Sequence, residues 1–192
     1  MRVAFVVNAF PVVSETFVLS QITGAIDRGH DVDIYACDRI EPPVGFPSSD
    51  FEGYRLDQRV RYFDVPAALL LRIARGAKTL VDGWRAPFLC ARSLNVMRYG
   101  RMAASLRLLN SLRSLLGHTP AYDVIHCQFG PLGNIALRLR QIGAWNGALV
   151  TAFRGYDATK LLKQSPNVYA DLFQQGDLFL PVSAALRDVL IA

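Results

Sequence analysis

The fold is decided near the start of the chain, where residues 2–36 read RVAFVVNAFPVVSETFVLSQITGAIDRGHDVDIYA. Arg2–Val7 is an apolar run of strand-forming residues, which is typical of a buried strand. Ser14 can cap a following helix whose apolar side chains recur at helical spacing, and Gly29 can end that helix. Residues 30–36 then alternate polar and apolar side chains, as a second strand does. This succession predicts a βαβ unit, in which two parallel strands are joined by a right-handed crossover.

The remainder of the chain continues the alternation of strands and helices. A long loop is expected over residues 37–58, where prolines, glycines and serines cluster. Further strands are expected at residues 60–63, 123–126, 148–151 and 177–180, and helices at residues 131–143, within 161–173 and after Ser183. We therefore predict an α/β fold with a Rossmann-like, doubly wound parallel sheet, forming a single domain over residues 1–192.

The composition excludes several classes of protein for this chain. The 192 residues are 52% hydrophobic and 19% charged, which excludes a disordered or collagen-like chain. Cys37, Cys90 and Cys127 have no CxxC spacing, so we expect neither a disulfide scaffold nor a zinc cluster, and a reducing cytoplasm is favoured. No uncharged apolar stretch approaches the roughly 18–20 residues that span a bilayer. The sequence has no GxGxxG fingerprint and no P-loop motif, which argues against a nucleotide-dependent epimerase or reductase.

Positive charge is concentrated in residues 66–117, which we call the basic insertion. It holds nine basic side chains and one acidic one, a net charge of +8, and its pattern predicts helices interrupted at Gly83 and Pro87. An amphipathic basic helix pair can lie among lipid headgroups, where each basic group contributes about 1 kcal/mol, so an anionic membrane surface is an expected partner. The side chains expected to contact it are Arg72, Arg75, Lys78, Arg101, Arg107 and Arg113.

The basic insertion has two other interpretations. Its helices could simply cover the sheet and have a basic outer face. Nucleic acid is not expected as a partner, because no recognition motif and few aromatic residues accompany the arginines.

Polar residues follow three of the expected strands at their carboxyl ends, where open α/β sheets bind ligands. The loop after the first strand leads into a helix N-terminus, which favours an anion. His126 ends another strand, and Arg154 and Asp157 follow the next one. These last two side chains could bind hydroxyl or phosphate groups, or could pair with each other at i, i+3 as a structural link. We expect Ser14, His126 and Arg154 to gather around a common hollow.

Two further patterns are assigned to structure. Asp31 and Asp33 have the DxD spacing that holds a divalent metal in some glycosyltransferases, but they begin a strand and so lie at the opposite edge from the expected site. We predict solvated strand carboxylates there and no metal. Cys127 is adjacent to His126, and neighbouring residues of a strand point to opposite faces, so a Cys/His nucleophile is not expected.

Four stretches resemble the N-terminal domain of family-4 retaining glycosyltransferases of the GT-B fold, close to those that build exopolysaccharide and colanic acid. They are residues 8–21, with the pattern N-x-F-P-x-x-S-E-T-F-x-x-x-Q, residues 29–32 (GHDV), residues 125–130 (IHCQFG) and residues 177–183 (DLFLPVS). The resemblance implies the acceptor-binding lobe of a two-lobed enzyme that transfers a hexose-type sugar from a nucleotide-sugar to a lipid-linked or polysaccharide acceptor. It also implies that the C-terminal donor lobe is absent and that the fragment is inactive alone. An apolar pattern still running at Ala192 agrees with that expectation.

The resemblance assigns roles to the residues at the strand ends. The expected catalytic residues are His126, Arg154 and Asp157, although many relatives have a histidine where this chain has Arg154. An arginine cannot act as a base near neutral pH, but it can stabilise a departing phosphate. The expected substrate-binding residues are Asn8, Phe10, Ser14, Glu15, Thr16, Gln128, Gly130 and Gly155.

The resemblance implies no cofactor and no metal, with the nucleotide-sugar acting as a substrate. The expected location is cytoplasmic, peripheral on the inner face of the cytoplasmic membrane. The alternative is a non-catalytic Rossmann-like module that binds a glycan, a lipid or a protein.

Overall fold

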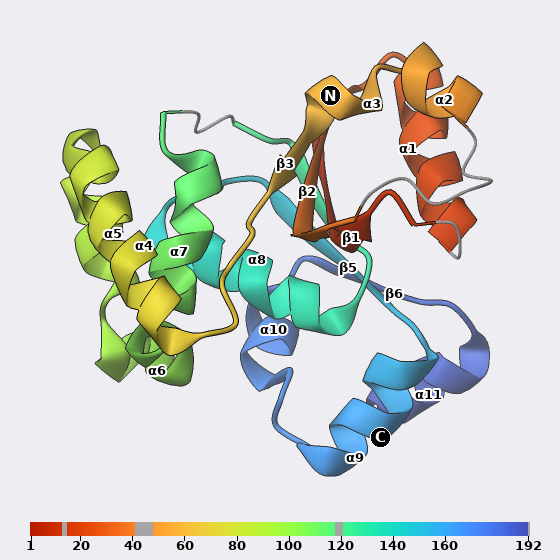
Figure 1. Ribbon diagram of the computed structural model, residues 1–192. Coiled ribbons are helices and arrows are strands. Elements are labelled where there is room, and N and C mark those ends of the chain that lie inside the picture. The colour runs from red at the N-terminus through yellow and green to blue at the C-terminus, as the bar shows by residue number, and fades with distance from the viewer. Residues whose placement is uncertain (13–14, 41–47, 118–120, 192) are drawn as a thin grey trace.

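The computed structural model describes residues 1–12, 15–40, 48–117 and 121–191. At its centre is one sheet of six parallel strands in the order β3-β2-β1-β4-β5-β6 (Figure 1). The strands are β1 (Arg2–Phe10), β2 (Asp31–Arg39), β3 (Val60–Tyr62), β4 (Val124–Cys127), β5 (Ala148–Phe153) and β6 (Leu178–Pro181). This is the strand order of a doubly wound sheet, so the predicted Rossmann-like α/β fold is confirmed.

The strand order reverses between β1 and β4. From β1 the chain moves outward to β2 and β3, returns to place β4 beside β1, and then moves outward again to β5 and β6. β1 is buried from Val3 to Val7, which explains why its apolar run shows no alternation. In open α/β sheets, ligands bind outside the carboxyl ends of the strands at such a reversal.

Helices cover both faces of the sheet. On one face lie α1 (Thr16–Asp27), α2 (Ser48–Gly53) and α3 (Leu56–Arg59), packed through Ile22 and Leu56 against Phe5, Val7 and Ile34. The other face carries α8 (Gly130–Ile142) and α10 (Ala170–Gln175), whose apolar residues pack with those of the strands in a second core. Two further helices are α9 (Leu162–Gln164), which precedes α10, and α11 (Ala184–Ile191), which follows β6.

The basic insertion forms a separate group of helices beside α8 (Figure 1). The helices are α4 (Leu69–Asp82), α5 (Pro87–Ser93), α6 (Val96–Ala104) and α7 (Arg107–Leu112), with short 3₁₀ turns at Gly83–Arg85 and Arg113–Leu115. The predicted interruptions at Gly83 and Pro87 are confirmed. A further break occurs at Leu106, which has a φ of 58° in the left-handed region. A single apolar stripe from Met102 to Leu116 does not signal this break, because leucine is an ordinary helix residue.

The long loop predicted over residues 37–58 is wrong at its start, where β2 continues to Arg39, and in its second half, which forms α2 and α3. Residues 41–47 lie outside the described part of the chain. Leu56 is buried, and the rings of Phe51 and Phe10 stack with centroids 6.1 Å apart. Helices this short are not stable by themselves in water, so packing against the sheet must stabilise them.

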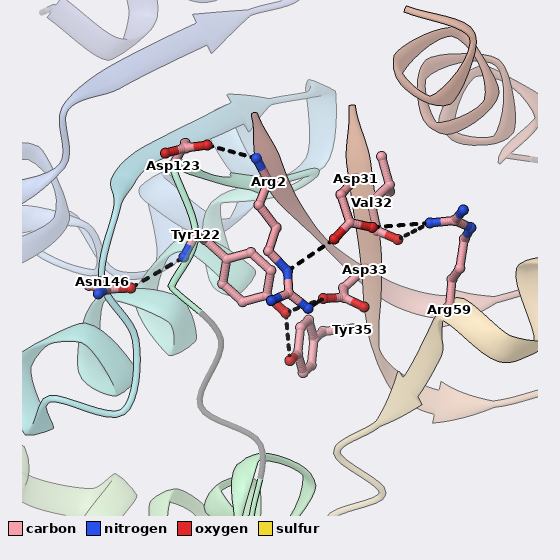
Figure 2. A network of polar contacts seen from close by, with 9 residues as sticks. All are labelled: Arg2, Asp31, Val32, Asp33, Tyr35, Arg59, Tyr122, Asp123 and Asn146. Atoms are coloured by element: carbon pink, nitrogen blue, oxygen red, sulfur yellow. Dashed lines mark hydrogen bonds and ion pairs between the residues drawn. The ribbon is translucent and has the colours of Figure 1, made fainter. Parts of the chain in front are cut away.

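The amino-terminal ends of the strands are joined by a polar network (Figure 2). The Arg2 guanidinium forms ion pairs with Asp31 at 3.3 Å and Asp33 at 3.0 Å. The buried Tyr122 hydroxyl donates to Asp33 at 2.7 Å and lies 2.8 Å from the Tyr35 hydroxyl. Asp31 and Asp33, the two acids of the DxD pattern, therefore neutralise an arginine at the amino-terminal edge of the sheet. The solvated carboxylate predicted at each position is confirmed for Asp31, which is exposed, and wrong for Asp33, which is buried and accepts hydrogen bonds from Arg2 and Tyr122.

Among the described residues, no helix is both long enough and apolar enough to cross a bilayer.

Candidate functional site

The reversal of strand order brings three polar segments together at the carboxyl edge of the sheet. They are the start of α1, the end of β4 with the turn into α8, and the residues that follow β5. We call the side chains that meet there the Arg154 cluster, which consists of Glu15, Phe17, Gln21, His126, Gln128 and Arg154.

Arg154 is the centre of this cluster. Its guanidinium carbon lies 3.7 Å from the centroid of the Phe17 ring, a cation–π contact. Its Nη2 donates to the Oε1 of Gln128 at 3.1 Å, and the amide of Gln128 donates to Gln21 at 2.8 Å. Gln128 is fully buried, so the arginine is held in one orientation by α1 and by the turn after β4.

Three polar atoms of the cluster are buried without a hydrogen-bond partner among the described residues. They are the Oε2 of Glu15, the Nε2 of His126 and the Nε of Arg154. A buried polar group that is left unpaired costs about 1–3 kcal/mol. A catalytic or binding role is one explanation of such groups, so three of them in one place mark a candidate functional site.

The charges of the cluster respond to burial and to one another. Burial raises the pKa of the Glu15 carboxyl above its usual value, although the nearby Arg154 charge opposes this shift. Burial lowers the pKa of His126, and the Arg154 charge lowers it further. His126 is therefore a neutral imidazole at neutral pH, and Arg154 remains a cation because even a lowered arginine pKa lies far above neutrality. Such a set can bind an anionic group and hydrogen-bond a hydroxyl.

Asp157 positions the loops around the cluster. Its carboxylate accepts the backbone N–H of Gly130 at 2.9 Å and that of Arg154 at 3.3 Å, and its side chain is only 2% exposed. The structural link expected as an alternative for Asp157 therefore exists, but it runs to the backbone of Arg154. In this structure Asp157 positions the two loops, and the catalytic role expected of it stays a prediction.

The other expected substrate-binding residues divide by exposure. Phe10, Gln128 and Gly130 are buried, and the N–H of Gly130 donates to Asp157, so these three have structural roles here and the substrate contacts expected of them stay a prediction. The exposed residues are Asn8, Thr16 and Gly155, while Glu15 is half-buried. We expected Ser14, His126 and Arg154 around a common hollow. Ser14 lies outside the described residues, so the structure shows only that His126 and Arg154 lie close together.

Sequence reasoning missed Phe17 and Gln21 as members of the cluster. Residues four apart lie on the same face of a helix, so the positions of the two in α1 could have indicated a shared face. Neither residue type by itself signals a site, and their partners lie more than 100 positions away in the sequence. Cys127 is fully buried and burial raises its pKa, which agrees with the packing role expected for it.

The expected membrane-contact residues also differ in placement. Arg72 is 9% exposed and donates to the carbonyl oxygens of Ser105 and Ala67, so its expected contact with a membrane is wrong. Arg75 forms an ion pair with Asp64 at 2.7 Å. The side chains of Lys78, Arg101 and Arg107 are exposed and that of Arg113 is half-buried.

The chain is similar to three proteins named for polysaccharide biosynthesis. It is 35% identical over 187 residues to the putative colanic acid biosynthesis glycosyltransferase WcaL of Salmonella typhimurium, covering 95% of this chain and 45% of that protein. It is 32% identical over 192 residues to WcaL of Escherichia coli, with the same two coverages. It is 31% identical over 202 residues to the amylovoran biosynthesis glycosyltransferase AmsK of Erwinia amylovora, covering 100% of this chain and 47% of that protein.

The chain thus spans about half the length of the curated relatives it matches. No family model matches it.

Proposed function

We propose that this chain is the acceptor-binding part of a glycosyltransferase that acts in exopolysaccharide biosynthesis. The observation that carries the proposal is the Arg154 cluster at the reversal point of a Rossmann-like sheet, where three buried polar atoms have no hydrogen-bond partner in the part of the chain that the structure describes. The similarity to proteins named as colanic acid and amylovoran glycosyltransferases supports a sugar as the group transferred.

The finer assignment follows from the resemblance of the sequence motifs. The enzyme would belong to the retaining, family-4 glycosyltransferases of the GT-B fold and would take a hexose-type sugar from a nucleotide-sugar. Its acceptor would be lipid-linked or a polysaccharide. A second lobe would bind most of the donor, so residues 1–192 alone would transfer no sugar.

In this proposal the cluster acts through position and charge. In a retaining transfer, the departing diphosphate can accept the proton of the attacking hydroxyl on the same face of the sugar. The Arg154 cation would stabilise the negative charge that develops on that phosphate. The neutral His126 would hydrogen-bond a sugar hydroxyl, and Phe17 and Gln128 would keep Arg154 in place.

The proposal includes a peripheral location on an anionic membrane surface. The basic insertion exposes large apolar side chains, among them Met97 at 99%, Phe88 at 82%, Leu70 at 80% and Trp84 at 70%. Exposed apolar patches on a basic helical surface are typical of segments that lie among lipid headgroups. Such a surface would bring a lipid-linked acceptor to the protein.

The proposed function is tested by sugar transfer from radiolabelled UDP-glucose, UDP-galactose and GDP-fucose into lipid-extractable glycan. We would compare residues 1–192 alone with the same residues joined to the part of Salmonella WcaL that lies outside the similarity. We expect transfer only by the joined protein, and a loss of at least about a hundredfold for its Arg154→Gln variant, because removing one preorganised charge that acts on the transition state costs that much.

Three outcomes would overturn parts of this proposal. Transfer by residues 1–192 alone would contradict the incomplete enzyme, and inversion at the anomeric carbon of the product would contradict the retaining assignment. A joined protein that folds, binds an oligosaccharide and transfers nothing from any donor would favour the non-catalytic module.

A further inference from the structure

Three arginines of the basic insertion line one hollow between α4, α6 and α7. The hollow has a volume of about 330 Å³ and is lined by Arg72, Arg101, Met102, Ser105 and Arg107. We call it the arginine hollow. Its volume lies at the lower end of the range of about 300–1,000 Å³ that small-molecule sites occupy.

Arg72 is built into the floor of this hollow. Its guanidinium donates to Ser105 at 2.9 Å and to Ala67 at 3.3 Å, and its Nε has no hydrogen-bond partner among the described residues. The buried amide of Asn110 donates to the backbone carbonyl of Arg72 at 3.1 Å, which fixes this turn of α4 against α7. The part of the hollow formed by Arg72 is thus a packed feature of the fold, while Arg101 and Arg107 line it from the surface.

The positive charge of the arginine hollow has no counter-charge in the described part of the chain. Neither Arg72, Arg101 nor Arg107 forms an ion pair there, and no acidic residue among those described lines the hollow. A buried guanidinium without a carboxylate is unfavourable, and two more cations beside it add repulsion. Phosphate is the anion that suits such a set, because guanidinium groups bind its oxygens through paired hydrogen bonds.

An apolar hollow adjoins the arginine hollow. It also measures about 330 Å³, shares Met102 and Arg107 with the first, and continues to Phe63, Val65 and Ile135. Its other lining residues are Cys37, Asp38 and Ser111. The Asp38 side chain is exposed, and its charge would keep an anionic group on the arginine side. A ligand that occupies both hollows needs an anionic head and an apolar chain.

We propose that Arg101 and Arg107, beside the buried positive charge of Arg72, bind the phosphate or diphosphate group of an amphipathic ligand whose apolar chain lies along Met102, Val65 and Ile135. The anionic head would lie on the basic insertion and the apolar chain between the insertion and the sheet, and neither hollow is lined by a residue of the Arg154 cluster, so the ligand could be bound whether or not the protein transfers sugar.

The test is isothermal titration calorimetry of the 192-residue chain with three probes: farnesyl diphosphate, inorganic pyrophosphate and farnesol. We expect one-to-one binding of farnesyl diphosphate, with pyrophosphate at least about tenfold weaker because it leaves the apolar hollow empty. Farnesol, which lacks the charged head, should also bind at least about tenfold more weakly than farnesyl diphosphate.

Variants assign the binding to the proposed residues. Arg101→Gln and Arg107→Gln should each weaken both anionic probes by about tenfold to a hundredfold, since each removes charge-assisted hydrogen bonds. Met102→Gln should reduce the preference for farnesyl diphosphate over pyrophosphate. The matched control is Arg98→Gln, because Arg98 is exposed on α6 and lines neither hollow; it should change both affinities less than about twofold.

The proposal would be overturned by the absence of saturable binding of farnesyl diphosphate, or by equal affinities in the wild type, Arg101→Gln and Arg107→Gln. Binding of UDP as tightly as farnesyl diphosphate, in competition with it, would show a nucleotide site and would overturn the amphipathic ligand. None of these measurements depends on sugar transfer, so the two proposals can fail independently.

Discussion

The pKa of Glu15 depends both on burial of its side chain and on the neighbouring charge of Arg154. One of its carboxylate oxygens has no hydrogen-bond partner among the described residues, and the pKa of the carboxyl is raised chiefly by burial. A raised pKa in the folded state means that the folded protein binds a proton more tightly than the unfolded chain does. The stability that this proton contributes is complete below the unfolded value of 4.5 and is lost as pH rises through the folded value.

Glu15→Gln should therefore raise the melting temperature at pH 7 and have almost no effect at pH 4. The substitution removes an ionised group from a half-buried place at pH 7, whereas at pH 4 the native carboxyl is already mostly protonated. Thermal unfolding followed by circular dichroism at both values of pH measures the difference.

The control for this residue is Glu52→Gln, because Glu52 is exposed. It should leave the melting temperature unchanged at both values of pH. A gain for Glu15→Gln that persists undiminished at pH 4 would show that ionisation of the half-buried carboxyl is not the cause.

Among the secondary-structure elements, the segment after β5 is joined to the start of α8 by hydrogen bonds from the backbone N–H groups of Arg154 and Gly130 to Asp157. This leaves the turn into α8 closely packed: a Cβ built on Gly130 would lie 2.6 Å from the Tyr169 ring and 2.8 Å from Phe153. The segment after β5 has room, since a Cβ on Gly155 meets nothing within 4 Å. The two glycines therefore form a matched pair for testing how the Arg154 cluster is supported.

Gly130→Ala should lower the free energy of unfolding by about 1–3 kcal/mol, because the added methyl group forces packed aromatic rings apart. Gly155→Ala should change it by less than about 0.5 kcal/mol, as expected of a surface substitution. Urea denaturation monitored by tryptophan fluorescence would check both values. Equal losses in the two variants would contradict the close packing of the α8 turn.

The polar network at the other edge of the sheet joins β1 and β2 to Tyr122, two residues before β4 (Figure 2). Since the Tyr122 hydroxyl donates its proton to Asp33, the Tyr35 hydroxyl donates to Tyr122. The Tyr122 hydroxyl therefore forms hydrogen bonds with two buried partners, whereas the Tyr35 hydroxyl forms one with Tyr122.

Tyr122→Phe should lower the free energy of unfolding by about 1–3 kcal/mol, because it leaves the Tyr35 hydroxyl and one Asp33 oxygen without this partner. Tyr35→Phe should cost less, about 1 kcal/mol, since it removes a donor and leaves the rest of the network intact. Tyr156→Phe, at an exposed tyrosine, is the control in the same denaturation experiment. A Tyr122→Phe variant as stable as that control would refute the contribution of the network.

On the scale of the whole molecule, charge and exposed apolar surface coincide in the basic insertion. The helices α4 to α7 lie beside α8 (Figure 1). They expose large apolar side chains, and among the described residues the only basic side chain of the insertion that forms an ion pair is Arg75. Arg72 and Arg75 are engaged within the protein, so the surface charge comes from the remaining basic residues of the insertion.

The chain should bind vesicles that contain about 30% anionic lipid, and the bound fraction should fall in 0.5 M salt (roughly a 4 Å Debye length) because salt screens exposed charges. Phe88→Ser and Met97→Ser should each weaken binding by about tenfold, as expected when a side chain that contributes about 1.5–3 kcal/mol is removed from the lipid. Val182→Ser, at an exposed apolar residue outside the insertion, should have no effect. Vesicle flotation measures all of these, and equal binding to neutral vesicles would refute the membrane proposal.

Part of the candidate site could be anticipated from residue types at the ends of strands. His126 and Arg154 were expected together because the carboxyl ends of neighbouring parallel strands share one edge, and the structure brings them together. The roles of Phe10, Gln128 and Asp157 could not be anticipated, because whether a polar or aromatic side chain faces a ligand or the core depends on its burial. Arg72 illustrates the same limit. Its guanidinium donates to the carbonyl oxygens of Ala67, just before α4, and of Ser105, just after α6, and this burial cannot be inferred from the sequence around Arg72.

The local pattern of residues was sufficient to predict the parallel Rossmann-like sheet, the helix that ends before Gly29 and the interruptions at Gly83 and Pro87. These features depend on periodicity and turn chemistry, which act over a few residues. Long-range packing alone established the short helices α2 and α3, the break at Leu106, and which polar atoms lack partners. Gln21 and Gln128 lie 107 positions apart and still form a hydrogen bond. Such contacts follow from how the layers meet, and no short stretch of sequence contains that information.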